Sequence, residues 1–344
     1  MRKGKELLAA SKQFTSENRT RSWIETLGTL FLTILFLVIT FQDLPVIVRA
    51  FTSLVCGLLY VRLFVIYHDF QHRAILKDSA IASVLMNFIG LYLLAPQNVW
   101  TRTHEHHHNN NSKLTISGIG SYPTITRARF LGLPKNKQRI YLINRNPLTI
   151  ICGYFTVFIF WLNLKSVIES RSKHLDSLLA LVLHAVGTAA VLYFFGVTTF
   201  ILAWFIPFFI AFAIGSYLFY CQHNFPTAKF RENEDWNYVQ AALSSTSLMK
   251  MNPVMHWFTC NIGYHPVHHV NSRIPFYRLK EAFKGLPELE VAPTTSWNPI
   301  EVINCFRVKL WDPEMDRMIT LKELRTLQKS EKVAAPTTTR LKSA

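Results

Sequence analysis

The sequence has few cysteines and none of the common cofactor fingerprints. Its five cysteines are an odd number and include no CxxC pair, so nothing indicates a disulfide framework or a ferredoxin-type cluster. We find no flavin or nicotinamide fingerprint and no haem-binding domain. Residues 1–22 are polar and basic, without an apolar core before a cleavage site, so we expect no removable signal peptide.

Negative charge is also scarce. The chain has 37 Lys and Arg against 21 Asp and Glu, a formal net charge of +16. A nucleic-acid partner would suit this charge, but the sequence has no RNA- or DNA-binding motif. The basic residues lie in segments that flank apolar blocks, where Lys and Arg orient membrane spans and bind anionic lipid headgroups. We therefore expect a membrane partner and no nucleic acid.

Half of the 344 residues are apolar, and they gather in long blocks. Four blocks are long enough to cross a bilayer, and they occupy residues 23–41, 45–67, 175–196 and 198–222. They predict an all-α integral membrane fold with four transmembrane helices in two hairpins. Arg49 and Arg62, near the ends of the second block, are expected to snorkel to the interface. The shorter blocks 80–96 and 150–164 are expected to be interfacial or re-entrant.

The charge distribution predicts the topology. Residues 1–21 carry six Lys and Arg against two acids, residues 101–149 carry eight against Glu105 alone, and the two hairpin turns carry none. By the positive-inside rule, both termini and a histidine-rich cap are then cytoplasmic. We expect a cytoplasmic N-terminal segment at 1–22, a membrane domain at 23–285, and a cytoplasmic segment at 286–344. This last segment should contain an amphipathic helix near 313–331 and a disordered tail.

Histidine is the residue type with the clearest pattern. Three clusters each follow an apolar block: His68 and His72 in HDFQH, His104, His107 and His108 in HEHHH, and His265, His268 and His269 in HPVHH. Residues three and four apart share one face of a helix, so each cluster can direct its imidazoles to a common point. Neutral imidazole binds iron, copper, zinc or nickel. Eight imidazoles are too many for one ion, so we expect two.

Other readings of these histidines are weaker. A single pair at i and i+4 is common by chance, and HEHHH could be an exposed basic loop, but three clusters on one predicted side of the membrane favour metal. We expect other roles for the remaining histidines. His174 should be solvated, His184 should be a buried neutral imidazole bonded to backbone, and His256 should lie near the ligands. Asp69 could orient a ligand imidazole or be solvated.

The three clusters resemble the histidine boxes of the membrane fatty acid desaturase family, in their order and in their placement after apolar blocks. Similarity extends to WFTCNIGYHPVHHVNSRIPFYRL (257–279), to FYCQHNF (219–225), to RTHEHHHNNNS (102–112) and to RNPL (145–148). These segments are most similar to the acyl-lipid branch of the family. The resemblance covers roughly residues 45–285.

This resemblance implies a di-iron centre whose ligands are the eight box histidines and His223, with O2 as co-substrate. It implies an oxidoreductase that introduces a double bond into acyl chains of membrane lipids. In the acyl-CoA branch an asparagine one turn before the position of His223 helps to hold a metal through water. Here that position is Phe219, and Asn261 is a possible substitute. The division of the nine imidazoles between two irons stays open.

The electron donor must be a separate protein, because the chain has no redox cofactor motif of its own. A basic surface would suit an acidic ferredoxin, and cytochrome b5 is an alternative. A lipid, alkane or carotenoid hydroxylase or ketolase is the nearest alternative function. A non-enzymatic membrane metal-binding or transport protein is more remote, because it predicts ligands within the spans. We expect the protein in a bacterial cytoplasmic membrane.

Overall fold

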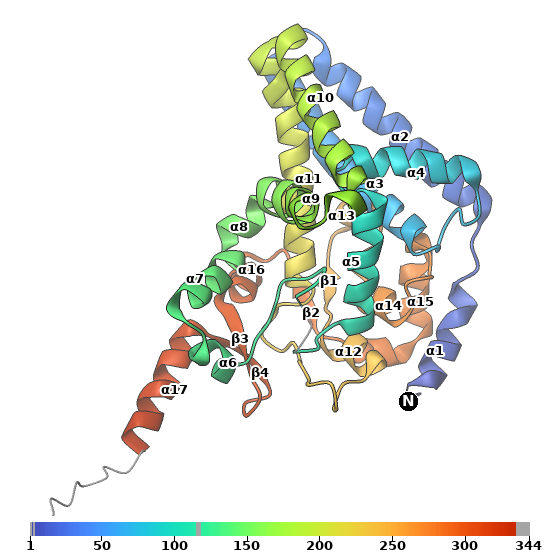
Figure 1. Ribbon diagram of the computed structural model, residues 1–344. Helices are drawn as coiled ribbons and strands as arrows, with labels where there is room; N and C mark the ends of the chain where they lie inside the picture. Colours follow the sequence, from blue (N-terminus) through green and yellow to red (C-terminus); the bar gives the residue numbers. More distant parts are fainter. Residues whose placement is uncertain (1, 3, 115–117, 335–344) are drawn as a thin grey trace, which may run out of the picture.

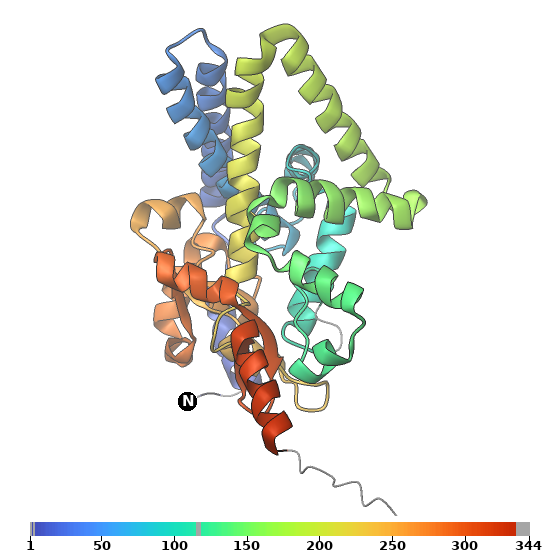
Figure 2. The same ribbon diagram turned by 90° about the vertical axis from the view of Figure 1, so that its left-hand side faces the viewer.

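The computed structural model of the chain describes residues 2, 4–114 and 118–334 (Figure 1). Most of the predicted disordered tail lies outside these residues. The described chain is mostly helical. Two long hairpins extend from one end of the molecule, and the short helices and strands are packed at the other end (Figures 1 and 2).

The first hairpin consists of α2 (Arg19–Phe41) and α3 (Val46–Gln71). Asn18 caps the start of α2, because its side chain accepts a hydrogen bond from the backbone N–H of Arg21. Pro45 directly precedes α3, where its fixed φ suits a helix start. Both helices are long and apolar enough to cross a membrane, as the sequence predicts.

The second hairpin is one 47-residue helical stretch, Leu175–Cys221, made of α10 (Leu175–Thr199), the π-helix η4 (Phe200–Phe205) and α11 (Ile206–Cys221). A straight helix of this length would measure about 70 Å, more than twice the hydrocarbon core of a bilayer. Gly196, with φ +76°, breaks the helix, and the two arms fold back on each other (Figure 2). The break falls at the predicted turn between the third and fourth blocks.

Neither short apolar block forms a straight span. α4 (Ala80–Tyr92) and α5 (Gln97–Asn110) meet at 88°. The second block forms α8 (Pro147–Ile151) and the π-helix η2 (Tyr154–Leu164), and α9 (Lys165–Glu169) continues it. Figure 2 shows this second segment lying crosswise to α11. Both shapes agree with the expectation of interfacial or re-entrant segments.

The remaining elements pack beneath the hairpins. They are α1 (Lys5–Ser11), η1 (Lys12–Phe14), α6 (Arg127–Gly132), α7 (Lys135–Asn144), η3 (Arg171–Lys173), α12 (Tyr238–Ser244), α13 (Pro253–Phe258), α14 (His265–Val270), η5 (Phe276–Arg278), α15 (Leu279–Gly285), η6 (Pro287–Val291), α16 (Pro299–Arg307) and α17 (Leu321–Ala334). α1 and α17, near the two termini, both lie at the end opposite the hairpin tips (Figure 1).

Two small sheets lie among the helices, which differs from the predicted all-α fold. β1 (Leu248–Lys250) pairs in parallel with β2 (Thr294–Ser296), and β3 (Val308–Asp312) pairs antiparallel with β4 (Arg317–Thr320). The predicted helix near 313–331 therefore begins later than expected, at Leu321, because the preceding residues pair as β4.

α3 and α11 approach closely and form the centre of the core. A Cβ at Gly57 of α3 would lie 2.8 Å from Cβ of Ile210 and 3.2 Å from the carbonyl oxygen of Pro207, so only glycine fits there. Further along, the rings of Phe158 and Phe212 stack with centroids 3.9 Å apart. The Gly57 contact holds α3 against α11, and the stack of Phe158 on Phe212 holds η2 against α11.

The expectation that Arg49 and Arg62 snorkel is wrong, because both are buried, at 7% and 2% exposure. Arg49 donates to the carbonyl of Thr40 at 2.9 Å and to the hydroxyl of Thr199 at 2.7 Å, so it joins the tips of the two hairpins. Arg62, on α3, has its partners on α2 and α13. Charged groups inside the spans are thus paired with other helices rather than directed to water.

Candidate metal centre

Nine buried or half-buried imidazoles from four places in the chain meet below the hairpins. His68 and His72 come from the end of α3, three more from α5, His223 from the turn after α11, and the last three from α14. They form two groups: His68, His72, His104, His108 and His268 in the first, and His107, His223, His265 and His269 in the second. Within each group the ligand atoms lie within 4.8 Å of one another. These are the nine residues that the sequence predicts.

The two groups are adjacent because two helices contribute to both. His107 and His108 are neighbours on α5 but belong to different groups, as do His268 and His269 on α14. Consecutive residues on a helix point about 100° apart, so one helix can present imidazoles to two centres at once. The rings of His108 and His269 stack between the groups, with centroids 4.3 Å apart. The structure thus divides the nine histidines into two groups, a division that the spacing of the boxes leaves open.

The spacing of the ring nitrogens fits metal ions. In the first group, Nε2 of His104 lies 2.8 Å from Nε2 of His68 and 3.1 Å from Nε2 of His108. In the second, Nε2 of His223 lies 3.1 Å from Nε2 of His107 and 2.9 Å from Nε2 of His265. Two imidazole nitrogens bound to one ion at about 2.1 Å and at a right angle are about 3.0 Å apart. The observed distances agree with this geometry.

The chemistry of the donors also fits. Among the described residues, the buried Nε2 atoms of His72 and His269 have no hydrogen-bond partner, a costly state that a bound cation would relieve. Burial lowers the pKa of His265, His268 and His269 well below its ordinary value, and lowers that of His223 to about 4. The rings are therefore neutral, which is the form that binds metal.

Outer contacts orient several of the rings. Oδ1 of Asp69, which is fully buried, lies 3.2 Å from Nδ1 of His68, and its Oδ2 accepts the backbone N–H of Phe276 at 2.7 Å. Nδ1 of His223 lies 3.2 Å from the carbonyl oxygen of Ser245. Partners of this kind fix the ring orientation of metal-ligating histidines. Of the two alternatives for Asp69, a solvated position is wrong because the side chain is buried, and its contact with His68 suits the orienting role. The contact with Ser245 had no signal in the sequence.

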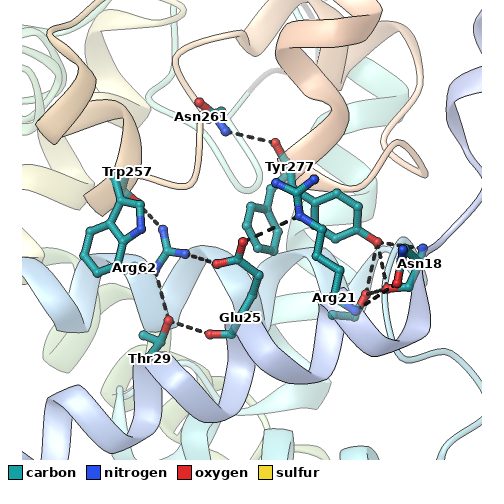
Figure 3. A network of polar contacts seen from close by, with 10 residues as sticks. Asn18, Arg21, Glu25, Thr29, Arg62, Trp257, Asn261 and Tyr277 are labelled. Carbon is teal, nitrogen blue, oxygen red and sulfur yellow. Dashed lines mark hydrogen bonds and ion pairs between the residues drawn. The ribbon is translucent and has the colours of Figure 1, made fainter.

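A polar network fastens the third histidine box to the first hairpin (Figure 3). Arg62 of α3 donates to Glu25, to the hydroxyl of Thr29 and to the carbonyl of Trp257, and its guanidinium lies 4.0 Å from the centre of the Trp257 ring. Trp257 lies in α13, eight residues before His265. Asn261, in between, donates to the carbonyl of Phe276 at 3.3 Å. The role of Asn261 as a substitute for the missing asparagine stays a prediction.

Substituting Glu25 by glutamine is expected to destabilise the protein, by on the order of 3 kcal/mol, because it leaves the buried Arg62 without its counter-charge. The measurement is the melting temperature of the purified protein in detergent. Asp78→Asn is the matched control, since Asp78 pairs with Arg73 at 2.7 Å in an exposed position where such a pair contributes little. Equal melting temperatures for the two variants would contradict a structural role for the Arg62 network.

The other histidines differ in part from expectation. His174 is buried rather than solvated, at 4% exposure, and accepts a hydrogen bond from Arg102. His184 is bonded to the hydroxyl of Tyr154 rather than to backbone. His256 stacks on Tyr264, with centroids 5.2 Å apart, and belongs to neither group. His106 is also outside both groups.

A narrow apolar slot leads to the histidines. It has a volume of about 50 Å³ and runs between α3 and α11, bounded by Phe64, Phe158, Gly215 and Phe219, until it reaches His68, His104 and His265. The ring of Phe219 lies 5.7 Å from that of His104 and 5.9 Å from that of His107, so it faces both groups. Phe219 therefore supplies an apolar wall where the acyl-CoA branch is expected to have a polar side chain.

The fold and the site together define a class: an integral membrane protein in which a histidine-lined centre, suited to metal, lies at the end of an apolar slot. The family model of fatty acid desaturases matches residues 45–298. The chain belongs to the fatty acid desaturase family, and it is an oxidoreductase. This confirms the resemblance of the histidine boxes and excludes the metal-transport alternative.

Individual relatives agree with this assignment. The chain is 27% identical over 326 residues to the fatty acid desaturase of Bacillus subtilis (strain 168), covering 94% of this chain and 92% of the relative. It is 23% identical to the sn-1 oleoyl-lipid 12-desaturase of Anabaena variabilis, over 80% of this chain and 79% of that protein. The enzyme of the same name from Synechocystis sp. is also 23% identical, over 73% of this chain and 72% of the relative.

Proposed function

We propose that the protein introduces a double bond into acyl chains of membrane glycerolipids, at a centre of two iron ions held by the nine histidines, with O2 as co-substrate. The observation that carries this proposal is the apolar slot that ends against both histidine groups. Two relatives named oleoyl-lipid desaturases support a lipid-linked acyl chain as the substrate.

The first group would hold one ion and the second group the other. When bound, iron would supply the O2-dependent oxidation of an unactivated methylene, which no side chain can perform by itself. The chain's own residues hold and align the acyl chain. Phe64, Phe158 and Phe219 enclose the slot in apolar surface, which excludes water from the reacting carbons and fixes their position beside the histidines.

The membrane placement follows from charge and length. We propose four spans in two hairpins, residues 23–41, 45–67, 175–196 and 198–222, with both termini and the histidine cap on the cytoplasmic side of a bacterial cytoplasmic membrane. The excess of Lys and Arg in residues 1–22 and 101–149 supports this orientation. Residues 23–285 would form the membrane domain and 286–344 a cytoplasmic segment.

Electrons would come from a separate protein, with an acidic ferredoxin ahead of cytochrome b5. The net charge of +16 supports an acidic partner, whose approach would be steered by opposite charge and weakened by salt.

The test is expression in a host without desaturases, followed by gas chromatography and mass spectrometry of double-bond derivatives. New double bonds in glycerolipid acyl chains are the expected product. Oxygenated acyl chains, alkanes or carotenoids would instead identify a hydroxylase or ketolase on the same scaffold. An unchanged lipid profile in cells that contain the iron-loaded protein and a ferredoxin system would contradict the proposal.

A further inference from the structure

A second, larger cavity adjoins the apolar slot. It has a volume of about 630 Å³ and lies between α5, η2, α9 and α11. We call it the outer chamber. Its lining includes apolar side chains such as Trp100, Phe158 and Phe219, together with Arg102, Lys165 and His174, which we call its polar side. A cavity lined by both apolar and cationic groups suits an amphiphile with a negatively charged head.

The polar side of the outer chamber is rich in donors. Arg102 donates to Nε2 of His174 at 3.0 Å, so the ring hydrogen of this neutral histidine is on Nδ1. Among the described residues this buried Nδ1 has no hydrogen-bond partner. A guanidinium has five N–H donors, and His174 takes one of them. The exposed guanidinium of Arg102 therefore keeps N–H groups for an acceptor in the chamber, whereas Nδ1 of His174 is enclosed by protein.

Lys165 adds a second positive charge. Its Nζ lies 3.2 Å from a carboxylate oxygen of Glu169, which also lines the chamber, and 4.3 Å from the centre of the Trp161 ring. Arg171 and Lys173 precede His174 and are exposed, so the cations around this side outnumber the acids Glu169 and Asp176. The carboxylate of Asp176 already accepts hydrogen bonds from the backbone N–H groups of Asn98 and Ser177.

The chamber lies at the level expected for lipid headgroups. The segment formed by η2 and α9 lies crosswise to the upright hairpins (Figure 2) and exposes Phe160, Trp161 and Leu164 beside Lys165. Exposed aromatic side chains next to a lysine are typical of the membrane–water interface. A lipid headgroup could therefore enter the polar side without leaving the interface.

The chamber and the slot are neighbours. Four residues, His104, Phe158, Gly215 and Phe219, line both cavities. An acyl chain whose ester end lies in the outer chamber would pass Gly215 and Phe219 to reach the histidine groups. The shared lining suits one occupant for the two cavities, with its charged end beside Arg102 and its methylene chain in the slot.

We propose that the polar side of the outer chamber binds the phosphate of a glycerophospholipid through Arg102 and Lys165, with His174 holding the guanidinium of Arg102 in place. The proposal rests on the proposed function and narrows its substrate to lipids with a phosphodiester headgroup. The enzyme then prefers phosphatidylglycerol to an uncharged glycolipid that carries the same acyl chains.

The test uses purified, iron-loaded enzyme with a ferredoxin system and mixed vesicles of phosphatidylglycerol and monoglucosyldiacylglycerol that carry distinguishable isotopic labels. We expect the ratio of desaturated phospholipid to desaturated glycolipid to fall at least fivefold in Arg102→Gln and in Lys165→Gln. Arg102→Lys keeps the charge and should retain most of the preference. Lys137→Gln removes an exposed cation outside the chamber and should leave the ratio unchanged.

Equal use of the two lipids by the unmodified enzyme would overturn the proposal, and so would an unchanged ratio in both glutamine variants. Either result would leave desaturation itself intact. Absence of double bonds from both lipids would instead overturn the proposed function, and the phosphate site with it. Desaturation of acyl-CoA in preference to both lipids would likewise remove the basis for a lipid headgroup site.

Discussion

Replacing His268 by alanine is expected to abolish double-bond formation. His268 belongs to the first histidine group, where its Nε2 lies 3.0 Å from Nε2 of His108, so its loss opens the ligand sphere of one ion. Mutation of the outer partners of a metal ligand alone typically costs 10- to 100-fold in metal affinity or activity. We expect a larger loss here. The measurements are lipid analysis of the expressing host and the iron content of the purified protein.

His256→Ala is the matched control. His256 lies in the same part of the chain and is partly buried, but it stacks on Tyr264 and belongs to neither histidine group. It should keep at least half of the activity and all of the iron. If His268→Ala retained normal iron content and activity, the assignment of the first group as a metal site would be wrong.

The sequence predicts the members of the two histidine groups well because the spacing of the boxes is a local property. HDFQH and HEHHH lie on single helices, so the distances along the chain translate directly into one face of α3 and of α5. The division between the two groups is not local. It depends on how α5 and α14 are rotated against α3 and on the turn that brings in His223, and these are set by tertiary packing.

The predictions for Arg62 and His174 are wrong for the same reason, since their contacts depend on tertiary packing. Arg62 and His174 are polar residues next to apolar blocks, which favours an interfacial or solvated position. Their partners, Glu25 and Trp257 for Arg62 and Arg102 for His174, are 37 to 195 residues away in the sequence. Nothing in the local pattern indicates such a partner. The sequence thus shows that these polar residues interrupt or border an apolar block. It does not show which residues they contact in the folded protein.

The hairpins, by contrast, were predictable from length alone, and so was the break at Gly196. A 47-residue apolar helix cannot lie straight across a bilayer, and a glycine is the residue that can adopt the φ of +76° needed at the break. The β3–β4 hairpin was not predictable in this way. Its strands have five and four residues, too few for an alternating pattern to be distinguished from the helical pattern that follows.

Enlarging Gly215 to leucine is expected to lower desaturation at least tenfold without loss of iron. Gly215 lines both the slot and the outer chamber, and a Cβ at this position meets no atom within 4 Å. The new side chain therefore enters the passage instead of clashing with the protein. Leucine also favours a helix over glycine by roughly 0.5–1 kcal/mol, so α11 should not be weakened. Product analysis and iron content of the purified variant are the two measurements.

Gly28→Leu separates a blocked passage from a general effect of the substitution. Gly28 is an exposed glycine of α2, and its Cβ would also meet no atom within 4 Å, but it lines neither cavity. This variant should keep full activity, and Gly215→Ala should lie between the two because one methyl group fills less of the passage. Full activity in Gly215→Leu would show that the acyl chain reaches the histidines by another path. Loss of iron in that variant would show that residue 215 must be small for α11 to position His223 in the metal centre.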